Sequence, residues 1–231
     1  MAPPTFSTLV SGYSFFEGPR WHAGRLWLSD FYTRQVIAVG LDGTVDTIAE
    51  VPGQPSGLGW LPDGRLLVVS MRNRKLLRRE PDGRLVEHAD LSAVAGGHAN
   101  DMVVDRQGNA YVGNFGFDLM GGAPFAPARL ARVAPDGTVS AVAEGLYFPN
   151  GSMVTPDGRT LIVGETFGNR LSAFDLLPDG SLATLSEDNG AYVFTRPIDP
   201  GRDMPEAARF RIGTTTAING KPYSVAFNEQ V

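Results

Sequence analysis

Residues 61–83 read LPDGRLLVVSMRNRKLLRREPDG, in which short apolar runs are separated by two Asp-Gly pairs. Glycine accepts a positive φ and aspartate bonds its own local backbone, so each pair suits the tight turn of a β-hairpin. The run at 66–69 has the length and β-branched content of a buried strand, and helical periodicity is almost absent from the chain. This stretch therefore predicts β-strands joined by tight turns.

The same unit recurs in two interleaved series up to about residue 185. One series of glycines precedes a strand, and it advances in steps of 40, 44 and 50 residues: Gly24, Gly64, Gly108 and Gly158. The other marks the following turns, in steps of 40, 54 and 43 residues: Gly43, Gly83, Gly137 and Gly180. Two phased series of hairpins are typical of the four-stranded blades of a β-propeller. A β-sandwich is the alternative, but it explains the density of turns and not their phase.

Composition excludes several classes of protein. The 231 residues carry a net charge of −5 and no Cys, which excludes disulfide scaffolds, Cys-ligated zinc and thiol catalysis. Mild acidity argues against a nucleic-acid partner, and no apolar run is long enough for a membrane helix. Residues 1–12 lack the pattern of a secretory signal. We therefore expect a cytoplasmic protein, monomeric or homodimeric, that binds neither nucleic acid nor membrane.

A long insertion at 113–128 accounts for the 54-residue step between turns. Loops of this length either line a functional site or cover an edge of the fold. The sequence leaves both interpretations open.

Oxygen-bearing side chains stand just before the strands expected to be innermost. Glu17, Asn100 and Asn150 occupy equivalent positions in three of the four repeats. In a propeller these positions converge on the mouth of the central channel, and carboxylate and amide oxygens suit a hard cation such as Ca²⁺ or Mg²⁺. Turn capping is the alternative role for each residue taken singly. Their common phase with the repeat favours a metal site.

Several motifs resemble one enzyme family. They are Phe16-Glu-Gly-Pro, Asn100-Asp, Phe148-Pro-Asn-Gly and the Pro-Asp-Gly turns. Over roughly residues 9–185 the chain is similar to the SMP-30/gluconolactonase/luciferin-regenerating enzyme family. The resemblance implies an all-β, six-bladed propeller with one divalent cation on its axis, Ca²⁺ foremost and Zn²⁺, Mg²⁺ or Mn²⁺ as alternatives. It also implies hydrolysis of a small sugar or aliphatic lactone by metal-activated water.

The resemblance also assigns roles to residues. It implies that Glu17 and Asn150 are metal ligands and that Asn100 contacts the substrate. His98 stands where many members have Arg, and we expect it to be a second substrate contact. The family's third ligand is an Asp about fifty residues after the Asn, which also serves as general base. Asp199 is the candidate for both roles, with Asp203 as the alternative.

Length limits the number of blades. We expect one propeller domain over 1–231, with clear blade repeats in 1–185 and a divergent, family-unlike tail at 186–231. At ~45 residues per blade this allows four blades and part of a fifth, hence an incomplete or atypically closed ring. Residues 222–228 are a candidate closing strand. The alternative function is a non-catalytic or degenerate propeller that acts as a binding module.

Overall fold

The computed structural model describes residues 7–183 and two further strands at 213–218 and 221–225. The first blade is an antiparallel sheet in chain order: β1 (Phe16–His22), β2 (Arg25–Asp30), β3 (Gln35–Val39) and β4 (Val45–Glu50). The second follows in the same order: β5 (Pro55–Trp60), β6 (Leu66–Ser70), β7 (Lys75–Arg79) and β8 (Leu85–Asp90). The third blade completes this series: β9 (Ala99–Val104), β10 (Ala110–Asn114), β11 (Ala128–Val133) and β12 (Val139–Leu146).

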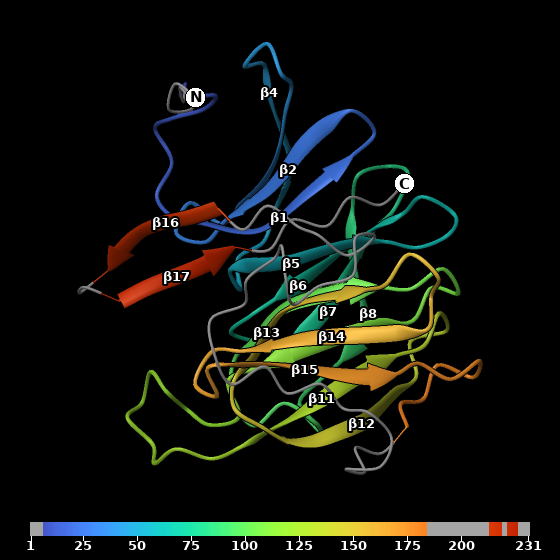
Figure 1. Ribbon diagram of the computed structural model, residues 1–231. Coiled ribbons are helices and arrows are strands. Elements are labelled where there is room, and N and C mark those ends of the chain that lie inside the picture. The colour runs from blue at the N-terminus through green and yellow to red at the C-terminus, as the bar shows by residue number, and fades with distance from the viewer. Residues whose placement is uncertain (1–6, 184–212, 219–220, 226–231) are drawn as a thin grey trace, which may run out of the picture.

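The fourth sheet has three strands in the described part of the chain: β13 (Pro149–Val154), β14 (Thr160–Glu165) and β15 (Arg170–Asp175). A separate two-stranded sheet consists of β16 (Gly213–Ile218) and β17 (Lys221–Val225). Figure 1 shows the blades following one another from the blue first blade to the orange fourth. None of the described residues is helical, so that part of the chain has no helix able to span a membrane.

The turns form for the reason that the sequence suggests. Gly64 has φ of 84°, and Asp63 Oδ1 accepts a hydrogen bond from the Arg65 backbone N–H at 3.0 Å. The same aspartate bond closes five further turns, at Asp42, Asp82, Asp136, Asp157 and Asp179. Local turn chemistry therefore sets the register of each blade.

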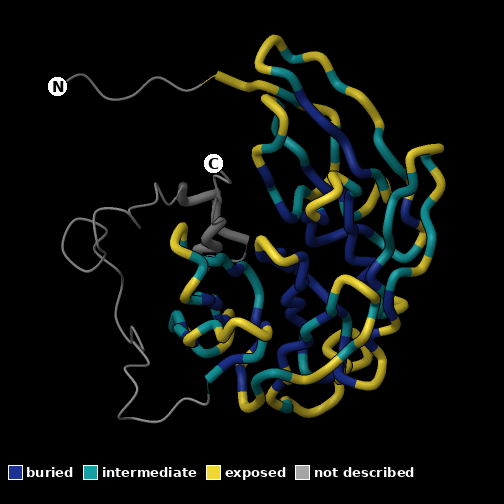
Figure 2. The backbone as a smooth tube through the Cα atoms, turned by 90° about the vertical axis from the view of Figure 1, so that its right-hand side faces the viewer, coloured by how far each residue is buried: buried dark blue, intermediate teal, exposed yellow. Residues whose placement is uncertain are grey.

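Neighbouring blades pack face to face through buried apolar side chains. Val36, Leu58 and Val68 join the first two blades, and Tyr111, Leu161 and Phe174 join the last two. A larger buried cluster between the second and third blades includes Leu67, Val69, Met102 and Val112. Figure 2 shows the buried segments gathered in the interior and the exposed ones at the turns.

Close approach of the inner strands requires a small residue. A Cβ on Gly57 of β5 would lie only 2.5 Å from the Met102 backbone nitrogen of β9. This contact brings the beginnings of the two strands together, which is where the candidate functional residues lie.

The structure confirms the all-β, incomplete propeller and not the sandwich, because the strands form separate consecutive sheets. The 54-residue step between turns corresponds to a loop at 115–127 between β10 and β11. The prediction of a closing strand at 222–228 is wrong where the structure describes it, because β17 pairs with β16 and not with a blade. Backbone pairing within this hairpin competes with addition to a blade edge.

Candidate functional site: four polar side chains at the channel mouth

Every inner strand carries an irregularity close to its beginning. The pairing register shifts between Glu17 and Arg20 in β1, and between Pro55 and Leu58 in β5. The pairings of β9 and β13 shift at the equivalent points. A β-bulge changes the direction of the side chains beside it. The four blades therefore repeat one local distortion at the same end of the channel.

The second residue of each inner strand is polar, and we call these four residues the mouth quartet: Glu17, Ser56, Asn100 and Asn150. The inner strands pack side by side in the order β1, β5, β9 and β13, so the quartet comes from neighbouring strands. Ser56 was missed by the sequence analysis, which counted carboxylate and amide oxygens only. Its phase with the repeat was the signal that could have found it.

Two oxygens of the quartet are buried without a partner. Asn100 is 3% exposed, and its Nδ2 donates to Pro149 O on the neighbouring strand at 2.9 Å. Its Oδ1, like Ser56 Oγ, has no hydrogen-bond partner in the described part of the chain. Burying an oxygen that accepts no hydrogen bond costs free energy. A cation or a substrate hydroxyl would satisfy both atoms.

Glu17 is the quartet's only carboxylate. Burial, which removes hydration from the charged form, and the nearby Asp101 charge together raise its pKa to about 7. The described residues offer its carboxylate no hydrogen bond and no ion pair. A partly buried carboxylate near a like charge favours the binding of a cation, which stabilises the ionised form.

Asn150 is partly buried at the beginning of β13. Its Nδ2 donates to Thr166 Oγ1 at 3.3 Å. A weak bond of this length leaves the amide able to turn its oxygen toward a ligand.

His98 precedes β9 by one residue and lies beside the quartet. Its ring centroid is 5.5 Å from that of Phe115, and its Nδ1 is buried with no partner among the described residues. Burial lowers the pKa of His98, and the charge of Arg72 lowers it further. The imidazole is therefore neutral near pH 7, with one nitrogen able to donate and one able to accept.

A second buried polar set ends the second strand of each blade: Asp30, Ser70, Asn114 and Glu165. These groups are satisfied. Asp30 accepts the backbone N–H groups of Ser14 and Phe15 at 3.0 Å each, and Glu165 accepts Arg170 Nε at 2.7 Å. Ser56 Oγ and Asn100 Oδ1 have no such partners in the described part of the chain, which makes the mouth quartet the better candidate for a ligand site.

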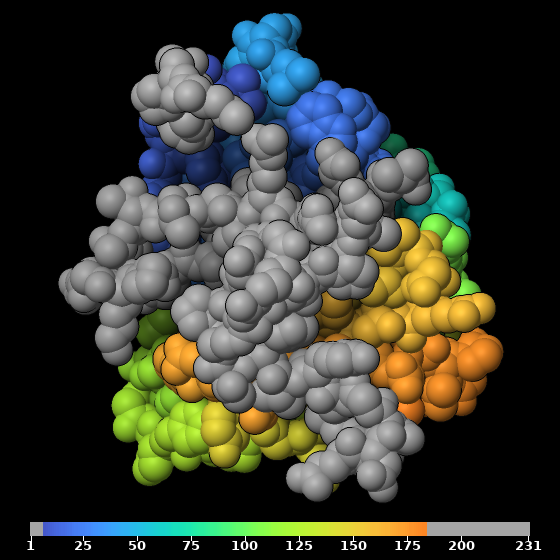
Figure 3. All heavy atoms as spheres, in the orientation of Figure 1, coloured from blue at the N-terminus to red at the C-terminus, as the bar shows by residue number. Residues whose placement is uncertain are grey.

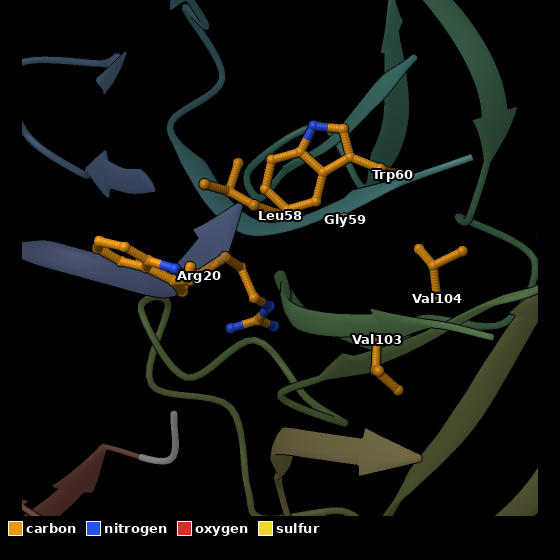
Figure 4. A pocket seen from close by; sticks show the side chains of 7 residues that line it. Arg20, Leu58, Gly59, Trp60, Val103 and Val104 are labelled. Carbon is orange, nitrogen blue, oxygen red and sulfur yellow. The ribbon is translucent and has the colours of Figure 1, made fainter. Parts of the chain in front are cut away.

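Close to Glu17, an ion pair joins the first and third blades. Arg20 Nη2 lies 2.7 Å from Asp101 Oδ1 and also donates to Met102 O at 2.5 Å. Figure 4 shows the Arg20 side chain extending from β1 toward β9, where it is one of the residues that line a small pocket. The Arg20 guanidinium thus binds Asp101 and the Met102 carbonyl of the third blade.

The predicted third ligand and base, Asp199, and its alternative Asp203 lie outside the described residues. Within those that are described, no group of three or more His, Cys, Asp or Glu side chains is placed to hold a metal. The quartet offers one carboxylate with amide and hydroxyl oxygens. An all-oxygen set fits a hard divalent cation better than zinc.

Comparison with known proteins gives a family and a fold. The family model described as the SMP-30/gluconolactonase/LRE-like region matches residues 15–192. A gluconolactonase from Xanthomonas campestris is similar, with 27% identity and a TM-score of 0.61 over 76% of this chain and 62% of that one. A calcium-binding protein, regucalcin from Agrobacterium tumefaciens, is similar with 26% identity and a TM-score of 0.65, over 80% of this chain and 61% of that one.

A luciferin-regenerating enzyme shares the fold, with 16% identity and a TM-score of 0.64 over 80% of this chain and 62% of that one. In each of these three comparisons the chain spans less than two thirds of the solved structure. The family match ends at residue 192, close to residue 185, where the sequence analysis ends the blade repeats.

Proposed function

Because the chain belongs to the SMP-30/gluconolactonase/LRE-like family, we propose that it is a divalent-cation-dependent lactonase that hydrolyses a small lactone. The family assignment made from the motifs is confirmed by the match over 15–192. The observation that carries the proposal is the mouth quartet, in which Asn100 Oδ1 and Ser56 Oγ are buried without partners beside a carboxylate of raised pKa.

Glu17 and Asn150 would hold the cation, and Ca²⁺ is the first candidate. The all-oxygen donors support a hard ion, with Mg²⁺ and Mn²⁺ as alternatives and Zn²⁺ last. The similar regucalcin is described as calcium-binding. When bound, the cation would supply Lewis-acid polarisation of the lactone carbonyl.

The chain's own residues would bind the substrate and move the proton. Asn100 Oδ1 would accept a hydrogen bond from the substrate, and the neutral His98 ring would supply a further donor or acceptor. Asp199, or Asp203, would take a proton from the attacking water. The water oxygen then bonds to the carbonyl carbon, the ring C–O bond breaks, and the ring oxygen gains a proton to give a hydroxy acid.

A binding module is the second candidate function. It is favoured by the quartet having a single carboxylate, which weakens cation binding relative to a site with two. In that case the propeller would bind a small ligand without hydrolysing it. The cytoplasmic location and the monomeric or homodimeric state remain predictions.

A pH-stat assay on chelator-treated protein tests the proposal. Glucono-δ-lactone and δ-valerolactone serve as substrates, with and without added Ca²⁺. We expect hydrolysis that returns with the cation and falls at least 100-fold in Glu17→Gln and Asn150→Ala. Asp157→Asn, in an exposed turn, is the control. Hydrolysis that is indifferent to chelator and to Asn150→Ala would refute the mechanism, whereas a stoichiometric cation without hydrolysis would favour the binding module.

A further inference from the structure

The channel mouth has a rim of residues held by the same backbone bond in every blade. The residue after each second strand donates its N–H to the carbonyl two positions before a quartet residue. The bonds measure 2.9, 2.9, 2.9 and 3.0 Å, in Phe31 to Phe15, Met71 to Gln54, Phe115 to His98 and Thr166 to Phe148. Three of the four donor residues, Phe31, Met71 and Phe115, have apolar side chains. The rim around the polar quartet is therefore mainly hydrophobic.

Side chains from all four blades meet in this rim. Met71, Phe115 and Phe148 form a buried cluster, 4%, 6% and 7% exposed, and Phe31 packs against it. The rings of Phe115 and Phe148 stack with centroids 4.3 Å apart. The two rings are adjacent to the site, because Phe115 bonds to His98 and Phe148 precedes the proline that accepts the Asn100 bond.

Phe148 is held in a costly conformation. Its φ of 60° lies in the left-handed region, which a bulky residue adopts only when its surroundings impose it. The preceding Tyr147 N–H donates to Glu165 Oε2 at 2.7 Å, and Thr166 bonds to the Phe148 carbonyl. These bonds fix the Phe148 backbone, one residue before the proline whose carbonyl accepts the Asn100 bond.

From Phe148 the aromatic side chains continue outward between the third and fourth blades. We call this set the aromatic wall: Phe115, Phe117, Phe125, Tyr147, Phe148 and Phe167. Phe148 and Phe167 centroids lie 4.8 Å apart, and those of Phe125 and Tyr147 lie 5.2 Å apart. In Figure 3 the yellow-green atoms of the third blade and the orange ones of the fourth meet at the lower left.

The outer part of the wall faces solvent. Phe125 is 50% exposed, Phe167 44% and Tyr147 41%. Phe117 and Phe125 belong to the loop at 115–127. Of the two roles that the sequence left open for this loop, the contacts favour lining a site. Exposed apolar clusters that continue from a polar site mark the place of an apolar ligand group.

We propose that the aromatic wall binds an apolar substituent of the lactone, so that the substrate is an alkyl- or aryl-substituted lactone and not a polyhydroxylated sugar lactone. This inference rests on the proposed function. A sugar lactone needs a hydrogen-bonding partner for each hydroxyl, because a buried hydroxyl without one costs binding free energy. The rim beside Asn100 consists mainly of apolar side chains. An alkyl chain can be buried against them without leaving any polar group unpaired.

A series of δ-lactones with the same ring tests the inference. We compare kcat/KM for δ-valerolactone, its 5-alkyl homologues and glucono-δ-lactone. We expect about a three- to four-fold rise per methylene until the wall is filled. Phe125→Ser and Phe167→Ser should reduce this rise, lowering kcat/KM more for the long-chain homologues than for δ-valerolactone. Leu41→Ser, at a 73% exposed position in a turn of the first blade, should change nothing. No dependence on chain length, or a preference for glucono-δ-lactone, would overturn the inference.

A binding measurement separates this inference from the proposed lactonase. Calorimetry with 5-alkyl δ-lactams, which resist hydrolysis, should show affinity rising with chain length and falling in Phe167→Ser. If no lactone is hydrolysed but the lactams bind in this way, the aromatic wall is supported as a binding site and the proposed lactonase activity is refuted. If neither assay depends on chain length, the wall is refuted. Sedimentation of Phe125→Ser adds a third outcome, because loss of a dimer would make the wall a contact between copies and overturn the inference.

Discussion

Arg20 and Asp101 form a buried ion pair that ties the first blade to the third across the channel, at an Nη2 to Oδ1 distance of 2.7 Å. The two side chains are 8% and 9% exposed. Asp101 is also the charge that raises the pKa of Glu17. Arg20 thus pairs with a second carboxylate near Glu17 and holds the strand that carries Asn100.

Arg20→Met should destabilise the protein strongly, because it leaves Asp101 buried without its partner. We expect a loss of about 3–5 kcal/mol in the free energy of unfolding, measured with urea. Arg25→Met is the matched control. Arg25 pairs with Asp46, whose side chain is 68% exposed, and such a pair contributes less than about 1 kcal/mol. Equal losses in the two variants would show that burial does not set the strength of the Arg20 pair.

The sequence predicted the blades well because each sheet forms from neighbours in the chain. Asp-Gly turns recur in every blade and close hairpins locally, so their phase carries the architecture. The Arg20–Asp101 pair had no such signal, since its residues are 81 positions apart and meet only once the inner strands converge.

The candidate site was predicted in part, for physical reasons. The positions of Glu17, Asn100 and Asn150 follow from the repeat, so counting along the chain found them. Ser56 escaped because a hydroxyl is a weak signal by itself, and burial of its Oγ is visible only in the fold. The neutral state of His98 likewise depends on packing, because burial lowers its pKa.

Glu17 should make the cation-free protein less stable as pH rises. Its native pKa of about 7 exceeds the ordinary 4.5, so the native state holds more protons than the unfolded state between these values. The free energy of unfolding should therefore fall across this window, by up to about 3 kcal/mol. Glu17→Gln should flatten the dependence, as measured by urea unfolding in chelator at pH 5 and pH 8. Exposed Glu50→Gln is the control, and a slope that survives Glu17→Gln would contradict the assignment.

Cation binding should depend on pH in the opposite sense. The cation needs the ionised Glu17 carboxylate, so its affinity should fall about ten-fold per pH unit below the pKa of about 7. Binding near pH 6 should release about one proton. Calorimetry in two buffers of different ionisation enthalpy measures that release. An affinity for Ca²⁺ that is constant from pH 5.5 to pH 8 would rule out Glu17 as the titrating ligand.

Ser56→Ala should have opposite effects on stability and on cation affinity. Ser56 Oγ is buried without a partner, so its removal should leave the cation-free protein unchanged or up to about 1 kcal/mol more stable. The same change removes a quartet oxygen, and we expect the affinity for Ca²⁺ to fall several-fold. Urea unfolding in chelator and calorimetric titration measure the two effects.

Ser70→Ala is the matched control for this substitution, because Ser70 is equally buried but its Oγ donates to Asn73 Oδ1 at 2.5 Å. It should cost about 1 kcal/mol of stability and leave the Ca²⁺ affinity unchanged. If Ser56→Ala instead destabilised the protein as Ser70→Ala does and bound Ca²⁺ normally, Ser56 would be a structural residue. The mouth quartet would then reduce to Glu17, Asn100 and Asn150, the three positions that the repeat alone indicates.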